Sequence, residues 1–101
     1  MIKLIGVERK TGEFNGKSYD NIIFHLVEPV VSDNDGFNIG ERAVLISSFG
    51  KLKPLSVKSI DVYKKTGVSD IADLSKFIGN EVFLHCDYRG NIDSIELVGE
   101  V

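Results

Sequence analysis

Residues 8–28 have the sequence ERKTGEFNGKSYDNIIFHLVE, which predicts two long strands joined at the dipeptide Asn15-Gly16. Both residue types tolerate the positive φ that a type I′ turn requires at its two central positions. After the turn, Ile22, Phe24 and Leu26 occupy alternate positions, as in a strand with one buried face. We therefore expect a long hairpin that places these three side chains in the core.

The end of this hairpin combines cations with aromatic rings. Arg9, Lys10 and Lys17 lie near Phe14 and Tyr19 in the sequence. A single nucleic-acid strand is bound by cations that contact its phosphates and by rings that stack on its bases. Two interpretations stay open from this stretch alone, a nucleic-acid contact and an ordinary solvent-exposed hairpin.

Length and composition predict a single domain over residues 1–101, because 43% hydrophobic content supplies one modest core. No apolar run approaches the ~18 residues that cross a bilayer, and the apolar part of MIKLIGVERK is too short for a signal peptide. We expect a cytoplasmic protein with no membrane partner. Cys86 is the single cysteine, and its alternating apolar segment predicts a small buried side chain.

The formal net charge of −3 argues mildly against binding a polyanion. However, most of the 12 lysine and arginine residues lie in residues 1–19 and 42–65, whereas residues 20–41 contain none. A folded chain with this distribution can present a basic groove on one side and an acidic surface elsewhere. Neighbouring opposite charges can equally neutralise blocks as short as these.

Further strands are indicated before and after the long hairpin. Gly6 interrupts the alternation of residues 2–11, which predicts a bulge or a bend. Residues 41–49 are almost continuously apolar, which predicts a third strand covered on both faces. Residues 81–88 and 92–98 alternate on either side of a glycine-containing turn, which predicts a closing hairpin.

Two segments between the third strand and the closing hairpin have helical signals. Residues 50–67 fit either a strand or a short helix that Ser56 caps and Gly67 stops, and we favour the helix. Residues 69–79 predict a clearer helix with Ser69 as its cap. The buried stripe expected on this second helix is Ile71, Leu74 and Ile78.

Catalytic and metal-binding signals are weak. His25 and His85 are interpreted as outward-facing strand residues, and His85 cannot pair with its neighbour Cys86 because adjacent strand residues point to opposite faces. Ser47 has no glycine elbow, and the sequence contains no phosphate loop or metal-ligand spacing.

Oxygen ligands occur in the loop of residues 32–40, but without the closing glutamate and flanking helices of a calcium-binding EF-hand. The four oxygen-bearing residues of this loop are Asp33, Asn34, Asp35 and Asn38. We expect no enzyme, cofactor, metal site or small-molecule substrate.

The order of these elements predicts a mainly β fold, a five-stranded OB-like β-barrel with a helix between strands 3 and 4. The chain resembles the small single-stranded-DNA-binding proteins of phages and conjugative elements, the gene V-like helix-destabilising group. The resemblance rests on the MIK opening, the hairpin FNGKSYDN, the strand LISSF and the closing FIGNEVFLHCDYRGNIDSIEL. It implies an OB-type barrel that coats single-stranded DNA and often dimerises.

We therefore expect a DNA-replication protein that coats single-stranded DNA with little sequence preference through a basic groove and stacking aromatic rings. Its expected partners are single-stranded DNA, or RNA, and a second copy of the chain. The side chains expected to bind the strand are Arg9, Lys10, Lys17, Tyr19, His25, Lys51, Lys53, Lys58 and Arg89. The alternative is a small β-barrel that serves as a protein-interaction or assembly module of a phage or mobile element. A continuous positive groove from the first hairpin to residues 51–65 favours DNA binding, and dispersed charge favours the alternative.

Overall fold

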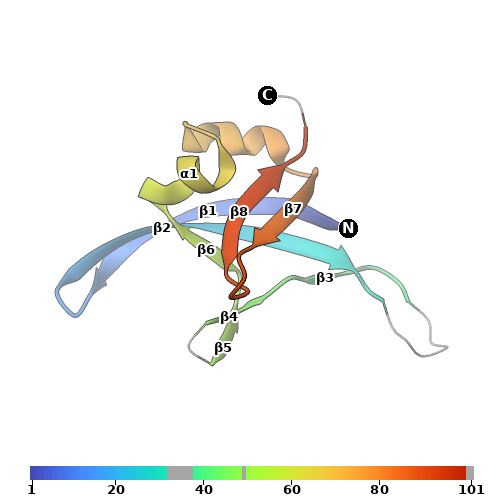
Figure 1. The fold of residues 1–101 in the computed structure, drawn as a ribbon, viewed down its shortest axis with the longest axis horizontal. Helices are drawn as coiled ribbons and strands as arrows, with labels where there is room; N and C mark the ends of the chain where they lie inside the picture. Colours follow the sequence, from blue (N-terminus) through green and yellow to red (C-terminus); the bar gives the residue numbers. More distant parts are fainter. Residues whose placement is uncertain (32–37, 49, 100–101) are drawn as a thin grey trace.

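A computed structural model describes residues 1–31, 38–48 and 50–99 (Figure 1). The chain is mainly β, with one six-stranded antiparallel sheet, a separate two-stranded sheet, and short helical segments between β6 and β7. Among the described residues, no helix is long and apolar enough to cross a membrane. The elements are β1 (Ile2–Phe14), β2 (Lys17–Pro29), β3 (Glu41–Ala43), β4 (Ile46–Ser48), β5 (Lys51–Lys53), β6 (Leu55–Lys58), η1 (Ser59–Asp61), α1 (Val62–Thr66), η2 (Ile71–Phe77), β7 (Glu81–Cys86) and β8 (Ile92–Leu97).

The predicted long hairpin is confirmed. β1 and β2 pair in antiparallel fashion from Lys3 opposite Val27 to the residues that flank the turn. Asn15 and Gly16 have φ values of 52° and 77°, the positive values that made this dipeptide a turn signal. The register shifts at the predicted bulge beside Gly6, and the turn end of the hairpin projects as an arm beyond the other strands (Figure 1).

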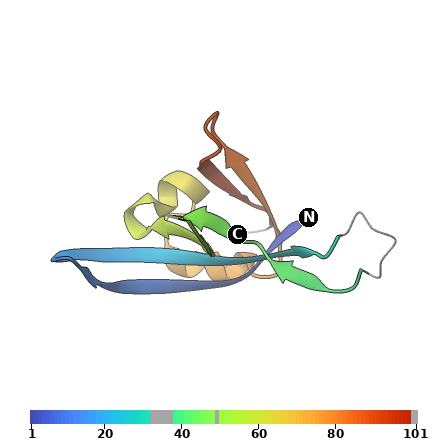
Figure 2. The same cartoon turned by 90° about the horizontal axis from the view of Figure 1, so that it is seen from below.

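The core lies on one side of the β1–β2 hairpin. In Figure 2, α1 and the β7–β8 hairpin lie above the β1–β2 hairpin. Ile22, Phe24 and Leu26 are at most 2% exposed, which confirms the core face assigned from their alternation. These three side chains belong to one buried apolar cluster whose other members come from β1, β6, α1, η2, β7 and β8. Those members are Leu4, Leu55, Val57, Val62, Leu74, Phe77, Val82 and Ile95.

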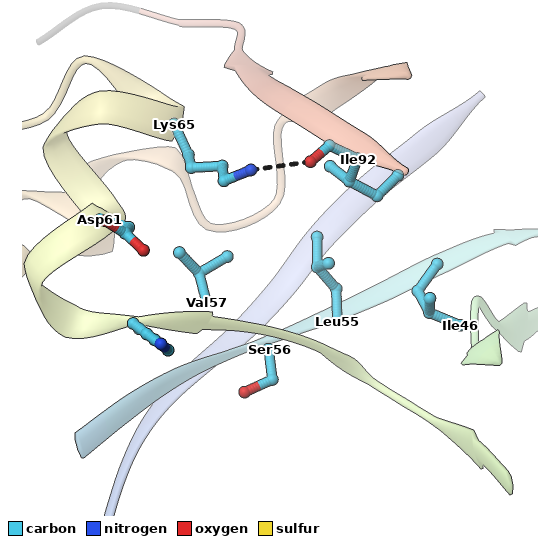
Figure 3. A pocket seen from close by; sticks show the side chains of 8 residues that line it. Ile46, Leu55, Ser56, Val57, Asp61, Lys65 and Ile92 are labelled. Carbon is cyan, nitrogen blue, oxygen red and sulfur yellow. Dashed lines mark hydrogen bonds between the residues drawn. The ribbon is translucent and has the colours of Figure 1, made fainter. Parts of the chain in front are cut away.

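The sheet is open, so the predicted closed five-stranded barrel is wrong. Its strand order is β3-β2-β1-β7-β8, and β6 pairs with β2 outside this path. Within the described residues no strand joins β6 to β8, and a cavity of about 310 Å³ lies there, lined in part by Leu55, Val57 and Ile92. Figure 3 shows Lys65 reaching from α1 toward β8, where its Nζ donates a hydrogen bond to the Ile92 carbonyl at 2.8 Å.

The middle of the chain also departs from the sequence-based prediction. The predicted strand of residues 41–49 is wrong over residues 41–48, because β3 pairs with β2, β4 pairs with β5, and Leu45 is 42% exposed. Residue 49 lies outside the described residues. Ser56 is not a helix cap, because it pairs with Ile23 in the β2–β6 ladder. The helical turn begins only after β6 and ends at Gly67, which adopts a φ of 79°.

The segment before β7 is a 3-10 helix rather than an α-helix. Asp70, not Ser69, caps it, and the Asp70 carboxylate accepts a hydrogen bond from the Ala72 amide at 3.0 Å. A 3-10 helix has three residues per turn, so Leu74 and Phe77 align on its buried side. Ile78, assigned to the buried stripe on α-helical spacing, is 42% exposed.

Cys86 is exposed, which corrects the prediction of a buried thiol. The β7–β8 register shifts between His85 and Cys86, so the alternation that places Leu84 inward does not continue to Cys86. The loop residues Asp33, Asn34 and Asp35, considered above as oxygen ligands and not favoured, fall outside the described residues.

Candidate nucleic-acid interface

The β1–β2 hairpin has two faces with different chemistry. Residues directly opposite one another in an antiparallel ladder point to the same side, and successive residues point to opposite sides. Arg9 pairs with the buried Ile22, whereas Lys10 pairs with Asn21 on the side away from the core. We call this second side, continued onto β6, the outer face. It carries Lys3, Gly6, Glu8, Lys10, Gly12, Phe14, Lys17, Tyr19, Asn21, Ile23, His25, Val27, Ser56 and Lys58.

A polar row crosses three strands of the outer face. Lys10 of β1 lies opposite Asn21 of β2, and Asn21 lies opposite Lys58 of β6. Neighbouring strands are about 4.8 Å apart, so the backbones of the two lysines are separated by about 10 Å. Both lysines are exposed, and neither forms an ion pair with another described residue. The row therefore presents two available cations on either side of an amide.

Tyr19 lies one row closer to the turn, opposite Gly12. Its ring covers Gly12 so closely that a Cβ added to the glycine would overlap the phenol. Because Gly12 has no side chain, the tyrosine ring can lie flat against β1 while remaining partly exposed. At the end of the arm, Lys17 pairs with Phe14, which is 71% exposed. The outer face thus places two rings near lysine side chains.

His25 is already paired on the outer face. Its Nε2 lies 2.7 Å from Oε1 of Glu8, and the two side chains are 39% and 55% exposed. The contact places an acidic side chain between His25 and the Lys10 row, because Glu8 is the next outer-face residue of β1 before Lys10. His25 therefore lies at the less basic end of the face.

Arg9 lies on the opposite side of the hairpin and is bound to Asp20. Arg9 Nε donates to Asp20 Oδ1 at 2.9 Å, and Arg9 Nη2 donates to Oδ2. These hydrogen bonds lower the pKa of Asp20 and raise the pKa of Arg9, because they stabilise the charged form of each group. The guanidinium charge is thus neutralised within the chain, which removes Arg9 from the outer-face set.

The other three predicted residues lie elsewhere. Lys51 and Lys53 are exposed on β5, in the separate two-stranded sheet that Figure 1 shows away from the β1–β2 turn. Arg89 is in the turn between β7 and β8, where its Nε donates to the Tyr88 hydroxyl at 3.0 Å. The outer face accordingly brings together Lys10, Lys17, Tyr19, His25 and Lys58 from the predicted set.

Sequence reasoning missed a cavity of about 300 Å³ beside the Lys10–Asn21–Lys58 row. Its lining includes Asn21 and Tyr19 from β2 together with Ser59 and Ile60 from η1. The alternation after the turn already placed Asn21 on the same face as Tyr19, which was an available signal. Nothing local in the sequence pointed to Ile60, because its position depends on where β6 leaves β2.

Comparison of the chain with protein-family models, with curated proteins and with solved structures gave no match.

Proposed function

We propose that this protein binds single-stranded DNA along the outer face, with little sequence preference. The observation that carries the proposal is the row in which Lys10 and Lys58 flank Asn21, with the ring of Tyr19 in the next row. Lysines on such a surface contact phosphates, and an exposed ring stacks on a base whatever its identity. An open sheet face also gives a flexible single strand more room than a closed pocket does.

The separation of charge on the arm supports this assignment. Lys10, Lys17 and Lys58 share the outer face, whereas Glu13 and Asp20 belong to the opposite face of the same ladder. A net charge of −3 is therefore compatible with a locally positive surface, because Glu13 and Asp20 point the other way and the outer-face acid Glu8 is paired with His25.

The order of elements gives a second line of support. A long hairpin, short strands, helical turns and a closing hairpin follow one another as in an OB-type chain. The resemblance of the FNGKSYDN hairpin to gene V-like proteins points to the same activity. We propose an OB-type relationship in which the strands of this chain remain open between β6 and β8.

The test is a fluorescence titration of a labelled oligothymidine at several salt concentrations. Counterion release lowers the logarithm of affinity by about 0.7 per unit of log salt for each phosphate neutralised on a single strand. Phosphate contacts by Lys10, Lys17 and Lys58 predict a slope of about −2, and participation of Lys51, Lys53 and Arg89 as well predicts about −4. No measurable binding at ~50 mM salt, a concentration at which counterion release strongly favours association, contradicts the proposal.

The second candidate function is a protein-interaction module whose partner can be a second copy of the same chain. Phe14, Ile60 and Tyr63 are 71%, 85% and 64% exposed, so these apolar and aromatic side chains are accessible to a protein partner. Sedimentation velocity over a range of protein concentrations measures self-association directly. A concentration-dependent dimer that fails to bind oligothymidine favours this candidate over DNA binding.

A further inference from the structure

The cavity beside the polar row lies at the edge of β2 where β6 ends. β6 pairs with β2 only from Asn21 to Phe24, so residues 17–20 of this edge have no strand partner within the described part of the chain. Such an edge presents main-chain N–H and C=O groups outward. The cavity of about 300 Å³ next to it is lined by Ser18, Tyr19, Asp20, Asn21, Lys58, Ser59 and Ile60.

The lining combines apolar walls with polar and charged side chains. Ile60 is 85% exposed and supplies an aliphatic surface, and Tyr19 supplies a ring. The one acid in the lining, Asp20, is bound by Arg9, and Arg9 together with Ser59 lowers the pKa of Asp20. Its charge is balanced inside the protein, so the acid does not repel an anionic strand as a free carboxylate does.

Lys58 determines the class of ligand. It lines the cavity and also belongs to the Lys10–Asn21–Lys58 row of the outer face. A ligand that fits both features has a flat heterocycle with hydrogen-bonding edges and an attached phosphate. A nucleotide within a strand has these parts, whereas an extended peptide that pairs with the edge lacks the phosphate.

We propose that this cavity takes one nucleobase of the bound strand. The inference rests on the proposed single-stranded-DNA binding and adds a specific base site to it. Tyr19 and Ile60 contact the base, the free edge of β2 with Asn21 hydrogen-bonds its polar edge, and Lys58 contacts the adjoining phosphate. Contacts made by a base rather than by phosphates are insensitive to salt.

The test titrates the parent protein, Ile60→Ala and the control Ile39→Ala with two probes of equal length. One probe is oligothymidine and the other is the same sugar–phosphate strand without bases. Ile60 and Ile39 are 85% and 70% exposed, so neither substitution removes a core side chain. We expect Ile60→Ala to weaken oligothymidine binding about fivefold, to leave binding of the abasic strand and the salt slope unchanged, and Ile39→Ala to match the parent.

Amide NMR shifts of the labelled parent protein locate the base independently. Oligothymidine is expected to shift the signals of Ile60 and of residues 18–21, and the abasic strand is expected to leave Ile60 in place. If Ile60→Ala binds both probes like the parent, or if shifts avoid Ile60, the base site is wrong although DNA binding stands. If the parent binds neither probe, the proposed function itself fails, and the base site fails with it.

Discussion

Arg9 and Asp20 form an ion pair of two hydrogen bonds on the core-facing side of the β1–β2 hairpin, with Arg9 Nε 2.9 Å from Asp20 Oδ1. The next residue, Lys10, points to the outer face because side chains alternate along a strand. Two adjacent cations in the sequence therefore have different roles. Arg9 is paired with Asp20 within the chain, and Lys10 remains available to a ligand.

This difference predicts unequal effects on DNA binding. Lys10→Ala is expected to weaken oligothymidine binding and to reduce the magnitude of the salt slope by about 0.7, because one phosphate contact is lost. The double variant Arg9→Gln/Asp20→Asn removes both charges of the internal pair and is expected to retain the parental slope. Salt-dependent titrations of both variants check this prediction. If the double variant reduces the salt slope and Lys10→Ala does not, the DNA binds the core-facing side of the hairpin and the proposed outer-face site is wrong.

The same ion pair predicts a pH dependence of stability. Arg9 lowers the pKa of Asp20 in the folded protein, so the pair stabilises the fold above the unfolded-state pKa of about 3.9. This contribution is lost as the pH falls through the depressed folded-state pKa. Asp20→Asn is expected to lower the urea midpoint at pH 7 and to converge with the parent in strong acid.

Urea unfolding of parent and variant between pH 2 and pH 7 measures this difference. Glu13→Gln is the matched control, because Glu13 is exposed on the same arm and forms no ion pair with any described residue. A constant gap between Asp20→Asn and the parent at every pH contradicts the assigned role of the carboxylate charge.

Local turn and strand chemistry made the first hairpin predictable. Asn15-Gly16 set the turn, and the alternation through Phe24 set the buried face, so both the register and the outer face followed from residues close in sequence. The open sheet was not predictable in this way. Its cause is a four-residue β6 that pairs with β2 and turns at once into η1, and no local pattern reports which edge a strand that short will join.

The errors at Ile78 and Cys86 have local physical causes. A helix with three residues per turn buries Phe77 in place of Ile78. The sequence fits both helix types, so it does not by itself determine which of these two residues is buried. A register shift between His85 and Cys86 ends the alternation that assigned the thiol to the core. For the candidate site, the sequence prediction included both Arg9 and Lys10, although alternation along the strand puts the two side chains on opposite faces. Lys58 was predicted from its charge alone, and its place beside Ile60 depends on the long-range β2–β6 pairing.

Exposure of Cys86 predicts rapid labelling of the native protein. A thiol-specific reagent is expected to modify Cys86 without denaturant at a rate close to that of the unfolded chain, because access does not require unfolding. Absorbance of the released chromophore measures the rate with and without urea. Labelling that appears only across the unfolding transition restores the buried assignment.

The contact between Tyr19 and Gly12 predicts that removing the Tyr19 ring and displacing it both weaken DNA binding. Tyr19→Ala is expected to cost about 1–3 kcal/mol of oligothymidine binding free energy with an unchanged salt slope, because a ring is lost and no cation is. Gly12→Ala keeps the ring but displaces it, since the added Cβ would overlap the phenol, and is expected to weaken binding in the same direction. Tyr19→Phe keeps the stacking surface and serves as the control that binds like the parent. Each titration is paired with a thermal unfolding measurement. If Tyr19→Ala and Gly12→Ala lose affinity only because their Tm is lowered, the ring stabilises the arm and does not contact DNA.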